Sequence, residues 1–309
     1  MTGIPRSGTS WVGKMLDAGG EVVYINEPLS DHRPPGRSPG ILAAPVHYRF
    51  QYISEANEPP YLAAFKETLA LRYHALAEIK QNRAPRDVAR MIKYWSSFTR
   101  GRLRSRRPLL DDPFAVFSAG WFAGRLDCDV IVTVRHPAAN AASRKRLGWR
   151  TDFRHLLNQP LLLEEWLHPF EADMHALVRS PDPLGEGALL WRMAHHVVGK
   201  VRERSPRLRI VRHEDLSFDP LGGYTELYHA LRLTLSQRAL GVIASSSNGG
   251  TRENGHTWSG LSKTGFRPLN SRANAVKWKT DLTPAEVSRI RALTEDVASL
   301  YYTDADWRQ

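Results

Sequence analysis

The sequence contains very little cysteine and no long apolar run. With one cysteine, Cys128, among 309 residues, the chain can form neither a disulfide framework nor a cysteine-rich zinc site. No apolar run reaches the roughly 18 residues that a membrane-spanning helix needs. The first residues include no apolar signal segment. We therefore expect a cytoplasmic protein that makes no membrane contact.

Lysine is also scarce, although the chain is basic. Basic residues outnumber acidic ones by 43 to 32, which gives a net charge of +11 at pH 7. Only 9 of the 43 are lysines, and 34 are arginines, whose side chain suits bidentate contacts with anions. The excess implies an anionic partner, which can be nucleic acid, a membrane surface or a phosphorylated small molecule. Composition alone does not choose among them.

Short apolar runs alternate with helical patterns along the chain. Glu21–Ile25, Val130–Val134 and the shorter Leu208–Val211 are typical of strands in a parallel sheet that is covered on both faces. Apolar residues recur at helical spacing over residues 62–76, 88–95, 187–204 and 224–231, and a capping box at Thr283–Glu286 precedes the last helix. This order predicts an α/β fold with a central parallel β-sheet and flanking helices. We expect a single domain over residues 1–309, with a helical insertion at approximately 30–105.

Three stretches lack this periodicity. They are Ser30–Pro45, the arginine-rich Arg100–Arg107 and Ser245–Asn274. A long loop in a compact domain is usually a lid, a binding loop or disordered. The run of arginines is interpreted most simply as a solvated basic face.

Residues Gly3–Trp11, with the sequence G-I-P-R-S-G-T-S-W, have the outline of a phosphate-binding loop. Backbone N–H groups of a glycine-bracketed turn, together with the start of the following helix, can surround an anion. The loop departs from the form G-x-x-x-x-G-K-[ST], because Thr9 occupies the lysine position and the cation of the loop is Arg6. The strand Val130–Val134 runs into Arg135, where a metal-binding carboxylate would be expected. The pattern predicts a phosphate loop without a metal site.

The loop resembles that of the sulfotransferases that use 3′-phosphoadenosine 5′-phosphosulfate (PAPS), which is approximately P-[KR]-S-G-T-[ST]-W. Arg135 at a strand end and Ser143 in the next helix are similar to the family's 3′-phosphate motif. His213–Leu216 is similar to its Y-E-D-L segment, and Trp278-Lys279 to its C-terminal W-[KR]. One departure is Leu110–Pro113, which has the sequence L-D-D-P where family members often carry K-D-P.

The resemblance implies two anion cradles for the donor. The first consists of Arg6, Ser7, Gly8, Thr9 and Ser10, and the second of Arg135 and Ser143. Trp11 would stack on the adenine, and His213 occupies the place of an adenine-contacting tyrosine in the family. Arg272, in the last irregular stretch, would reach back to the 3′-phosphate. Met1–Ile4 supply only a fragment of a first strand.

Sulfuryl transfer needs an acceptor hydroxyl in line with the sulfur, a base, and stabilisation of charge. Arg6 is always protonated, so it would stabilise the bridging oxygen of the leaving group electrostatically. We predict Glu27 as the base, because it follows the strand Glu21–Ile25 at the carboxyl edge of the sheet, and several family members use a glutamate there. A purely structural role for Glu27 is the alternative. The implied reaction transfers the sulfuryl group of PAPS to a hydroxyl of a small-molecule acceptor, without a metal.

Two other functions remain open. A small-molecule kinase would use ATP and Mg²⁺, and Thr9 at the lysine position argues against it. A nucleic-acid-binding protein would also be basic. However, the arginines are scattered, and the sequence has no helix-turn-helix, zinc-finger or aromatic RNA-binding signature. We therefore expect no nucleic-acid partner.

Overall fold

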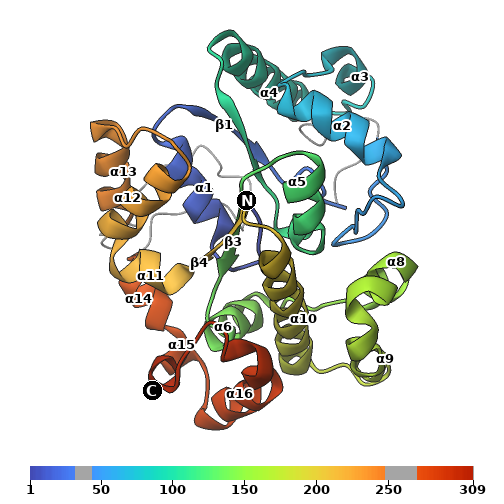
Figure 1. Ribbon diagram of the computed structural model, residues 1–309, viewed down its shortest axis with the longest axis vertical. Coiled ribbons are helices and arrows are strands. Elements are labelled where there is room, and N and C mark those ends of the chain that lie inside the picture. Colours follow the sequence, from blue (N-terminus) through green and yellow to red (C-terminus); the bar gives the residue numbers. More distant parts are fainter. Residues whose placement is uncertain (32–43, 248–269, 309) are drawn as a thin grey trace.

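The computed structural model describes residues 1–31, 44–247 and 270–308 of the chain (Figure 1). Its strands are β1 (Val22–Asn26), β2 (Arg107–Asp111), β3 (Val130–Val134) and β4 (Leu208–Arg212). Its α-helices are α1 (Thr9–Asp17), α2 (Pro59–Leu69), α3 (Ala75–Ile79), α4 (Pro85–Leu103), α5 (Ala119–Arg125), α6 (Pro137–Leu147), α7 (Arg154–Leu157), α8 (Pro160–Leu162), α9 (Glu171–Arg179), α10 (Pro183–Arg204), α11 (His213–Phe218), α12 (Pro220–Ala230), α13 (Gln237–Ser247), α14 (Ser271–Val276), α15 (Trp278–Asp281) and α16 (Pro284–Ala298).

The strands form two parallel pairs, β1 with β2 and β3 with β4. The first two residues of the chain join the pairs. The Met1 amine donates to the Leu110 carbonyl, and the Thr2 N–H donates to the Ile131 carbonyl (2.8 Å). The N terminus accordingly lies in the middle of the molecule (Figure 1). The strands thus form two parallel pairs, with Met1 bonded to β2 and Thr2 to β3, in place of the one central parallel sheet that was expected.

Helices cover both faces of the strands. In β3 alternate side chains belong to different apolar clusters, because successive residues of a strand point to opposite faces. Ile131 packs in a cluster with α1, α12 and α13, whereas Val130 and Val132 pack in the larger cluster that includes α5 and α10. All five residues of β3 are buried, which explains their continuous apolar, β-branched character.

Most of the elements expected from the sequence are present. The predicted strands agree with β1, β3 and β4 to within one residue at each end, and the Thr283–Glu286 capping box starts α16 as expected. The prediction of a helix over residues 62–76 is wrong in its second half. The helix ends at Leu69, and Leu71 takes a positive φ of 53°. Leu76, the last residue of that pattern, is 81% exposed.

The expectation that Arg100–Arg107 is irregular is wrong. The stretch is not an irregular basic segment, because α4 continues to Leu103 and β2 begins at Arg107. The helices α2, α3 and α4 lie between β1 and β2 in the chain, where the helical insertion was expected. Parts of the other two irregular stretches, residues 32–43 and 248–269, fall outside the described residues.

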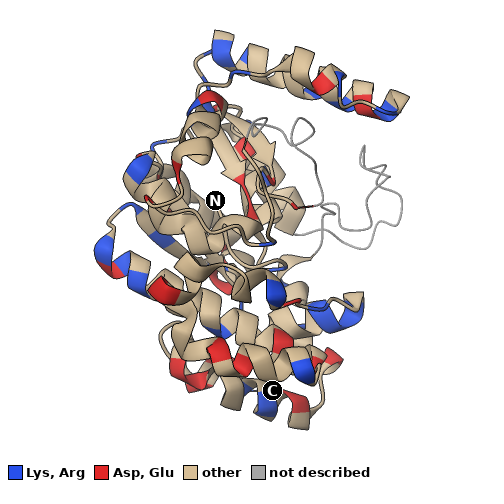
Figure 2. Cartoon of the chain, turned by 90° about the vertical axis from the view of Figure 1, so that its right-hand side faces the viewer, with Lys and Arg blue, Asp and Glu red and all other residues tan. Residues whose placement is uncertain are grey.

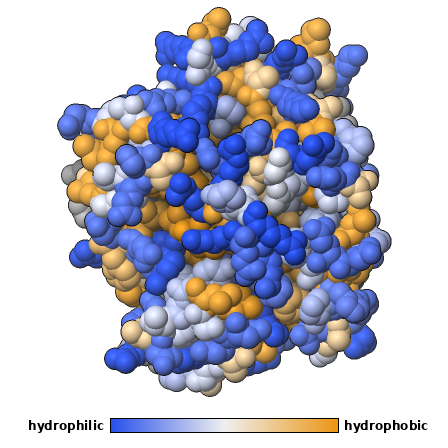
Figure 3. Space-filling view, in the orientation of Figure 1, coloured by the Kyte–Doolittle hydropathy of each residue, from blue (hydrophilic) through white to orange (hydrophobic). Residues whose placement is uncertain are grey.

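On the side of the molecule drawn in Figure 2, basic and acidic residues are interspersed over the helices. On the face drawn in Figure 3, hydrophilic side chains predominate and apolar ones show between them. Within the described ranges, no helix is long and apolar enough to cross a membrane.

Candidate functional site

The predicted phosphate loop leads directly from the first strand fragment into α1. Gly8 is the residue before the helix and has a positive φ of 98°. Its carbonyl accepts from the N–H groups of Trp11 (3.0 Å) and Val12 (3.1 Å). Because Gly8 has no side chain to cap the helix, the N–H groups of Thr9 and Ser10 in the first turn remain available to an anion.

Buried contacts hold the loop against β3. The Ser7 N–H donates to the Ile4 carbonyl (3.1 Å), which closes a tight turn. The Ser7 hydroxyl is fully buried and lies 2.8 Å from the hydroxyl of Thr133. Ser7 therefore fixes the loop on the strand, and its predicted contact with the donor stays a prediction.

The structure brings Arg6, Arg135 and Ser143 together, although 129 or more residues separate Arg6 from the other two in the chain. Arg6 Nε donates to Ser143 Oγ at 3.0 Å. Arg135 Nη1 donates to the backbone carbonyl of Arg6 at 3.1 Å. Asn140, on the same helix as Ser143, donates to the Pro5 carbonyl (3.1 Å). The end of β3 and the start of α6 are thus attached to the phosphate loop.

Arg135 is a buried cation. Burial lowers its pKa to about 10, and the positive charge of Arg6 adds to this effect, whereas the carboxylate of Glu214 opposes it. The guanidinium stays protonated at neutral pH. Its Nη2 donates to the Asn274 carbonyl (3.2 Å), while the buried Nε has no hydrogen-bond partner within the described part of the chain. A buried guanidinium with an unused donor suits a phosphate group.

Trp11 and His213 pack against each other beside the loop. Their ring centroids are 5.3 Å apart, and Tyr224 meets Trp11 edge to face at 5.6 Å. His213 is buried directly behind Gly8, and burial lowers its pKa well below the ordinary histidine value. His213 is therefore neutral and supports the loop from behind. The predicted contacts of Trp11 and His213 with adenine stay predictions.

Arg272 lies at the start of α14, and its side chain points toward α11. The guanidinium donates to the Phe218 carbonyl, at 2.7 Å from Nη2. The same helix nevertheless reaches the site through Asn274, whose carbonyl accepts from Arg135. No motif in the sequence pointed to Asn274. The predicted contact of Arg272 with the 3′-phosphate stays a prediction.

Carboxylates gather on the other side of the loop, at the ends of β1 and β2. Glu27 follows β1 with a positive φ of 49°, and its N–H donates to the Asp111 carbonyl (2.7 Å). Burial raises the pKa of Asp111, and hydroxyl contacts from Tyr24, Thr9 and Ser10 oppose this rise. The Tyr24 hydroxyl donates to the Asp111 carboxylate, which lies beside Thr9 and Ser10 of the phosphate loop. The only sequence signal for Asp111 was the departure from K-D-P.

Asp112 has a structural role. It is fully buried, and its carboxylate accepts from the N–H groups of Leu29 (2.5 Å) and Phe114 (2.9 Å). Burial raises its pKa to about 7. These bonds hold together the chain segments that follow β1 and β2, and so fix the backbone next to Glu27.

Replacing Gly8 with alanine should abolish the phosphate loop as a binding site. An added Cβ would lie 2.4 Å from His213 Cδ2 at a backbone conformation that L-residues rarely adopt. We expect the affinity for adenosine 3′,5′-bisphosphate to fall at least ~30-fold in calorimetry. Gly124→Ala on α5 is the matched control, because nothing lies within 4 Å of its added Cβ. Unchanged affinity in Gly8→Ala would remove the loop from the site.

Comparisons with known proteins gave structural likenesses only. No protein-family model matches the chain, and no curated protein matches it. A solved sulfotransferase domain from the Synechococcus PCC 7002 olefin synthase is 17% identical, with 98% of this chain and 93% of that chain covered and a TM-score of 0.47. A sulfotransferase domain from the curacin biosynthetic pathway is 19% identical, with 98% and 99% covered and a TM-score of 0.48. At these values the likenesses carry no functional argument, so a function has to be argued from the site itself.

Proposed function

We propose that this chain is a sulfotransferase that moves the sulfuryl group of PAPS to a hydroxyl of a small-molecule acceptor. One observation carries the proposal. Arg6 of the phosphate loop bonds through its side chain to Ser143 and through its backbone carbonyl to Arg135. PAPS carries two separate anionic groups and needs two cradles within reach of one nucleotide. The first turn of α1 and the buried Arg135 supply cradles of that kind, side by side.

Each cradle has its own chemistry. Backbone N–H groups at the start of α1 would hold the 5′-phosphosulfate, with the hydroxyls of Thr9 and Ser10 beside them. Arg135 and Ser143 would hold the 3′-phosphate with a charge-assisted donor and a hydroxyl. In this structure the Arg6 guanidinium is bonded to Ser143, so it lies at the second cradle, while its backbone belongs to the first.

The reaction itself requires little beyond positioning and charge. Arg6 would stabilise negative charge on the bridging oxygen as the sulfuryl group leaves, and for this its guanidinium would exchange the bond to Ser143 for one to the 5′-phosphosulfate. Glu27 would accept the proton of the acceptor hydroxyl at the carboxyl end of β1. Support for this role comes from its fixed backbone, which is bonded to Asp111.

One observation favours a second candidate, a small-molecule kinase. Asp111 lies beside Thr9 and Ser10, and a serine of a phosphate loop beside an aspartate at a strand end is the arrangement that holds Mg²⁺ in many nucleotide-binding proteins. Thr9 at the lysine position still argues against ATP.

Calorimetry on the intact chain separates the two. We expect adenosine 3′,5′-bisphosphate to bind with micromolar affinity, with or without Mg²⁺, and at least ~10-fold more tightly than adenosine 5′-monophosphate, since only the former carries a 3′-phosphate. ATP that binds more tightly than the bisphosphate, and only with Mg²⁺, would favour the kinase. Equal affinity for the bisphosphate and the monophosphate would contradict the second cradle.

A further inference from the structure

The net charge of the chain is concentrated in one segment, although arginines occur throughout the sequence. Residues 79–107 contain ten of the basic residues and a single acidic one, Asp87, so they carry +9 of the net +11. The rest of the chain is therefore close to neutral. The segment runs from the end of α3 through α4 to the start of β2, and none of its residues belongs to the predicted donor site.

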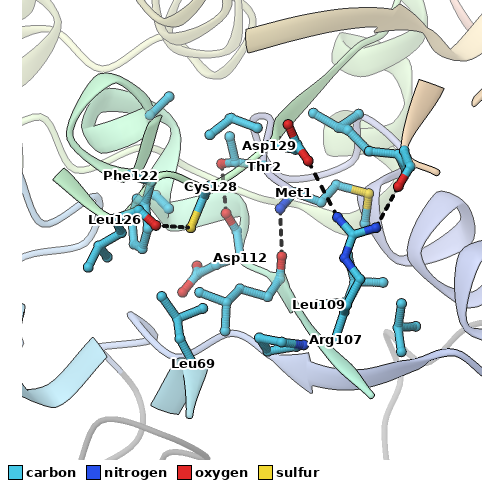
Figure 4. A pocket seen from close by; sticks show the side chains of 18 of the residues that line it. Met1, Thr2, Leu69, Arg107, Leu109, Asp112, Phe122, Leu126, Cys128 and Asp129 are labelled. Carbon is cyan, nitrogen blue, oxygen red and sulfur yellow. Dashed lines mark hydrogen bonds and ion pairs between the residues drawn. The ribbon is translucent and has the colours of Figure 1, made fainter. Parts of the chain in front are cut away.

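Most cations of this segment have no acidic partner. Asp87 pairs with Arg90 (3.4 Å), and Arg107 reaches Asp129 (3.4 Å) (Figure 4). Within the described ranges the other eight form no ion pair, and they are Lys80, Arg83, Arg86, Lys93, Arg100, Arg102, Arg104 and Arg106. All of the eight except the half-buried Arg106 are exposed. Unpaired, exposed cations create a positive potential over this surface, which attracts an anionic partner.

The helix α4 has three different sides, whose centres lie about a third of a turn apart at 3.6 residues per turn. The first side is buried, because Phe98 packs in one apolar cluster with Val23 and Ile25 of β1. The second side is an exposed apolar row at helical spacing, which consists of Val88, Ile92, Trp95 and Leu103. The third side is an exposed cationic row, which consists of Arg86, Lys93, Arg100 and Arg104.

The apolar row is unusual for a helix at a protein surface. Its residues are between 40% and 79% exposed, whereas the solvent side of an amphipathic helix is normally polar. Leu76 and Ile79 of α3, which packs against α4, are exposed as well. Both helices lie at the edge of the molecule (Figure 1). The described part of the fold therefore leaves this apolar surface uncovered.

An anionic membrane surface matches both rows at once. An interfacial amphipathic helix buries its apolar side about 5–10 Å into the boundary between headgroups and acyl chains. Lysines and arginines beside that side are attracted to anionic lipids. Tryptophan is enriched at this depth of a bilayer, and Trp95 lies in the middle of the apolar row.

Other anionic partners match only one of the rows. The phosphates of a nucleic acid would pair with the cations, but the apolar row would stay exposed beside a polar surface. An acidic protein helix would need a hydrophobic groove, whereas the apolar row lies along one side of a single helix. A bilayer is fluid and needs no groove, so the observations favour a membrane.

We propose that α3 and α4 form a surface that binds the interface of an anionic phospholipid membrane. The apolar row inserts between the headgroups, and the cations of the segment contact the lipid phosphates. The sequence-based expectation of no membrane contact rested on the lack of a spanning run, which binding at the surface does not need. The surface contains no residue of the donor site, so it can fail while the proposed function stands, and the reverse.

Flotation of the full chain with lipid vesicles, without nucleotide, tests this surface. We expect binding to phosphatidylcholine vesicles that contain roughly 30% phosphatidylserine, and at least ~10-fold weaker binding to phosphatidylcholine alone. Added salt should weaken the binding to the anionic vesicles by screening the cations.

Two double variants separate the contributions of the rows. Lys93→Glu with Arg100→Glu reverses two exposed cations and should weaken binding to the anionic vesicles at least ~10-fold. Ile92→Ser with Trp95→Ser removes two exposed apolar side chains and should weaken it at least ~10-fold as well. Because all four side chains are exposed, we expect both variants to keep the melting temperature of the parent chain.

Matched controls make the same changes on other helices and loops. Arg179→Glu with Arg202→Glu reverses two exposed cations that form no ion pair within the described residues. Leu221→Ser with Leu300→Ser removes two exposed leucines. Both controls should bind the anionic vesicles within about twofold of the parent chain, because charges farther than a Debye length from the membrane are screened.

The position of Trp95 gives an independent readout. Brominated phosphatidylcholine in the anionic vesicles should quench tryptophan fluorescence of the bound parent chain, and Trp95→Phe should remove most of that quenching. Absence of vesicle binding, or equal losses in the controls, would overturn the proposal. Binding that Ile92→Ser with Trp95→Ser leaves unchanged would mean adhesion by charge alone and would overturn it too. Tighter binding to duplex DNA or to an acidic helical peptide than to the vesicles would assign the surface to that partner instead.

Discussion

Replacing Arg135 with alanine is expected to weaken the binding of adenosine 3′,5′-bisphosphate about 100-fold in calorimetry. Removing one partner of a buried, hydrogen-bonded charge pair typically costs 2–5 kcal/mol, and 100-fold corresponds to about 2.7 kcal/mol. Because its guanidinium is buried and its Nε donor is unused, we expect Arg135 to contribute more binding free energy to the second cradle than Ser143 does. Ser143→Ala removes one neutral hydroxyl and should cost about tenfold.

Controls distinguish lost binding from lost structure, because Arg135 also bonds to the carbonyls of Arg6 and Asn274. Arg135→Lys keeps the charge but not the planar fork, and should fall between wild type and Arg135→Ala. Arg192→Ala removes an arginine that pairs with Asp296 on α16, away from the site, and should leave affinity unchanged. If Arg135→Ala binds the bisphosphate as tightly as wild type while remaining folded, the second cradle is elsewhere.

The elements that carry the site were visible in the sequence because each has a strong local signal. The apolar run Val130–Val134 predicts a buried strand. Arg135, which follows it directly, is therefore predicted at the carboxyl edge of the sheet. The turn between Gly3 and Gly8 is similarly local, since both glycines take positive φ values, which glycine adopts without a steric penalty. Local signals of this kind are sufficient to predict the strand end and the turn, and anion binding at them stays a prediction.

The neighbours of the loop could not be predicted, because they depend on tertiary packing. The bond between Arg6 and Ser143 joins residues 137 apart in the chain, and no spacing rule encodes it. Asn274 and Asp111 reach the loop from segments with no motif of their own. Their positions near the loop can be recognised only when the strands are placed side by side.

The strand β2 was missed for a different reason. Its first residues, Arg107 and Pro108, follow a run of arginines and have low strand propensity. Proline belongs in a strand only where its missing N–H is not needed. Here Arg107 donates its N–H to the Glu21 carbonyl on the β1 side, so the missing N–H of Pro108 falls on the side of β2 that does not pair with β1.

Replacing Glu27 with glutamine is expected to lower turnover by 10²- to 10⁴-fold, the usual contribution of a general base, while nucleotide affinity stays within about twofold. Glutamine keeps the size and backbone of Glu27 but cannot accept the proton. The measurement is release of adenosine 3′,5′-bisphosphate from PAPS, with the best acceptor from a panel of phenols, sugars and alcohols.

Glu21→Gln is the matched control, because Glu21 precedes the same strand at its amino end, where its carboxylate accepts from the Thr234 N–H (3.0 Å). Its loss should leave turnover unchanged, since the chemistry is placed at the carboxyl edge. If the Glu27 carboxylate is structural instead, Glu27→Gln should lower the melting temperature and the nucleotide affinity together, because the carboxylate would then help to hold the segment that is bonded through its backbone to Asp111 beside the loop. Full turnover in a folded Glu27→Gln would move the base to another residue. A loss of turnover alone is the result that only a proton-accepting role explains.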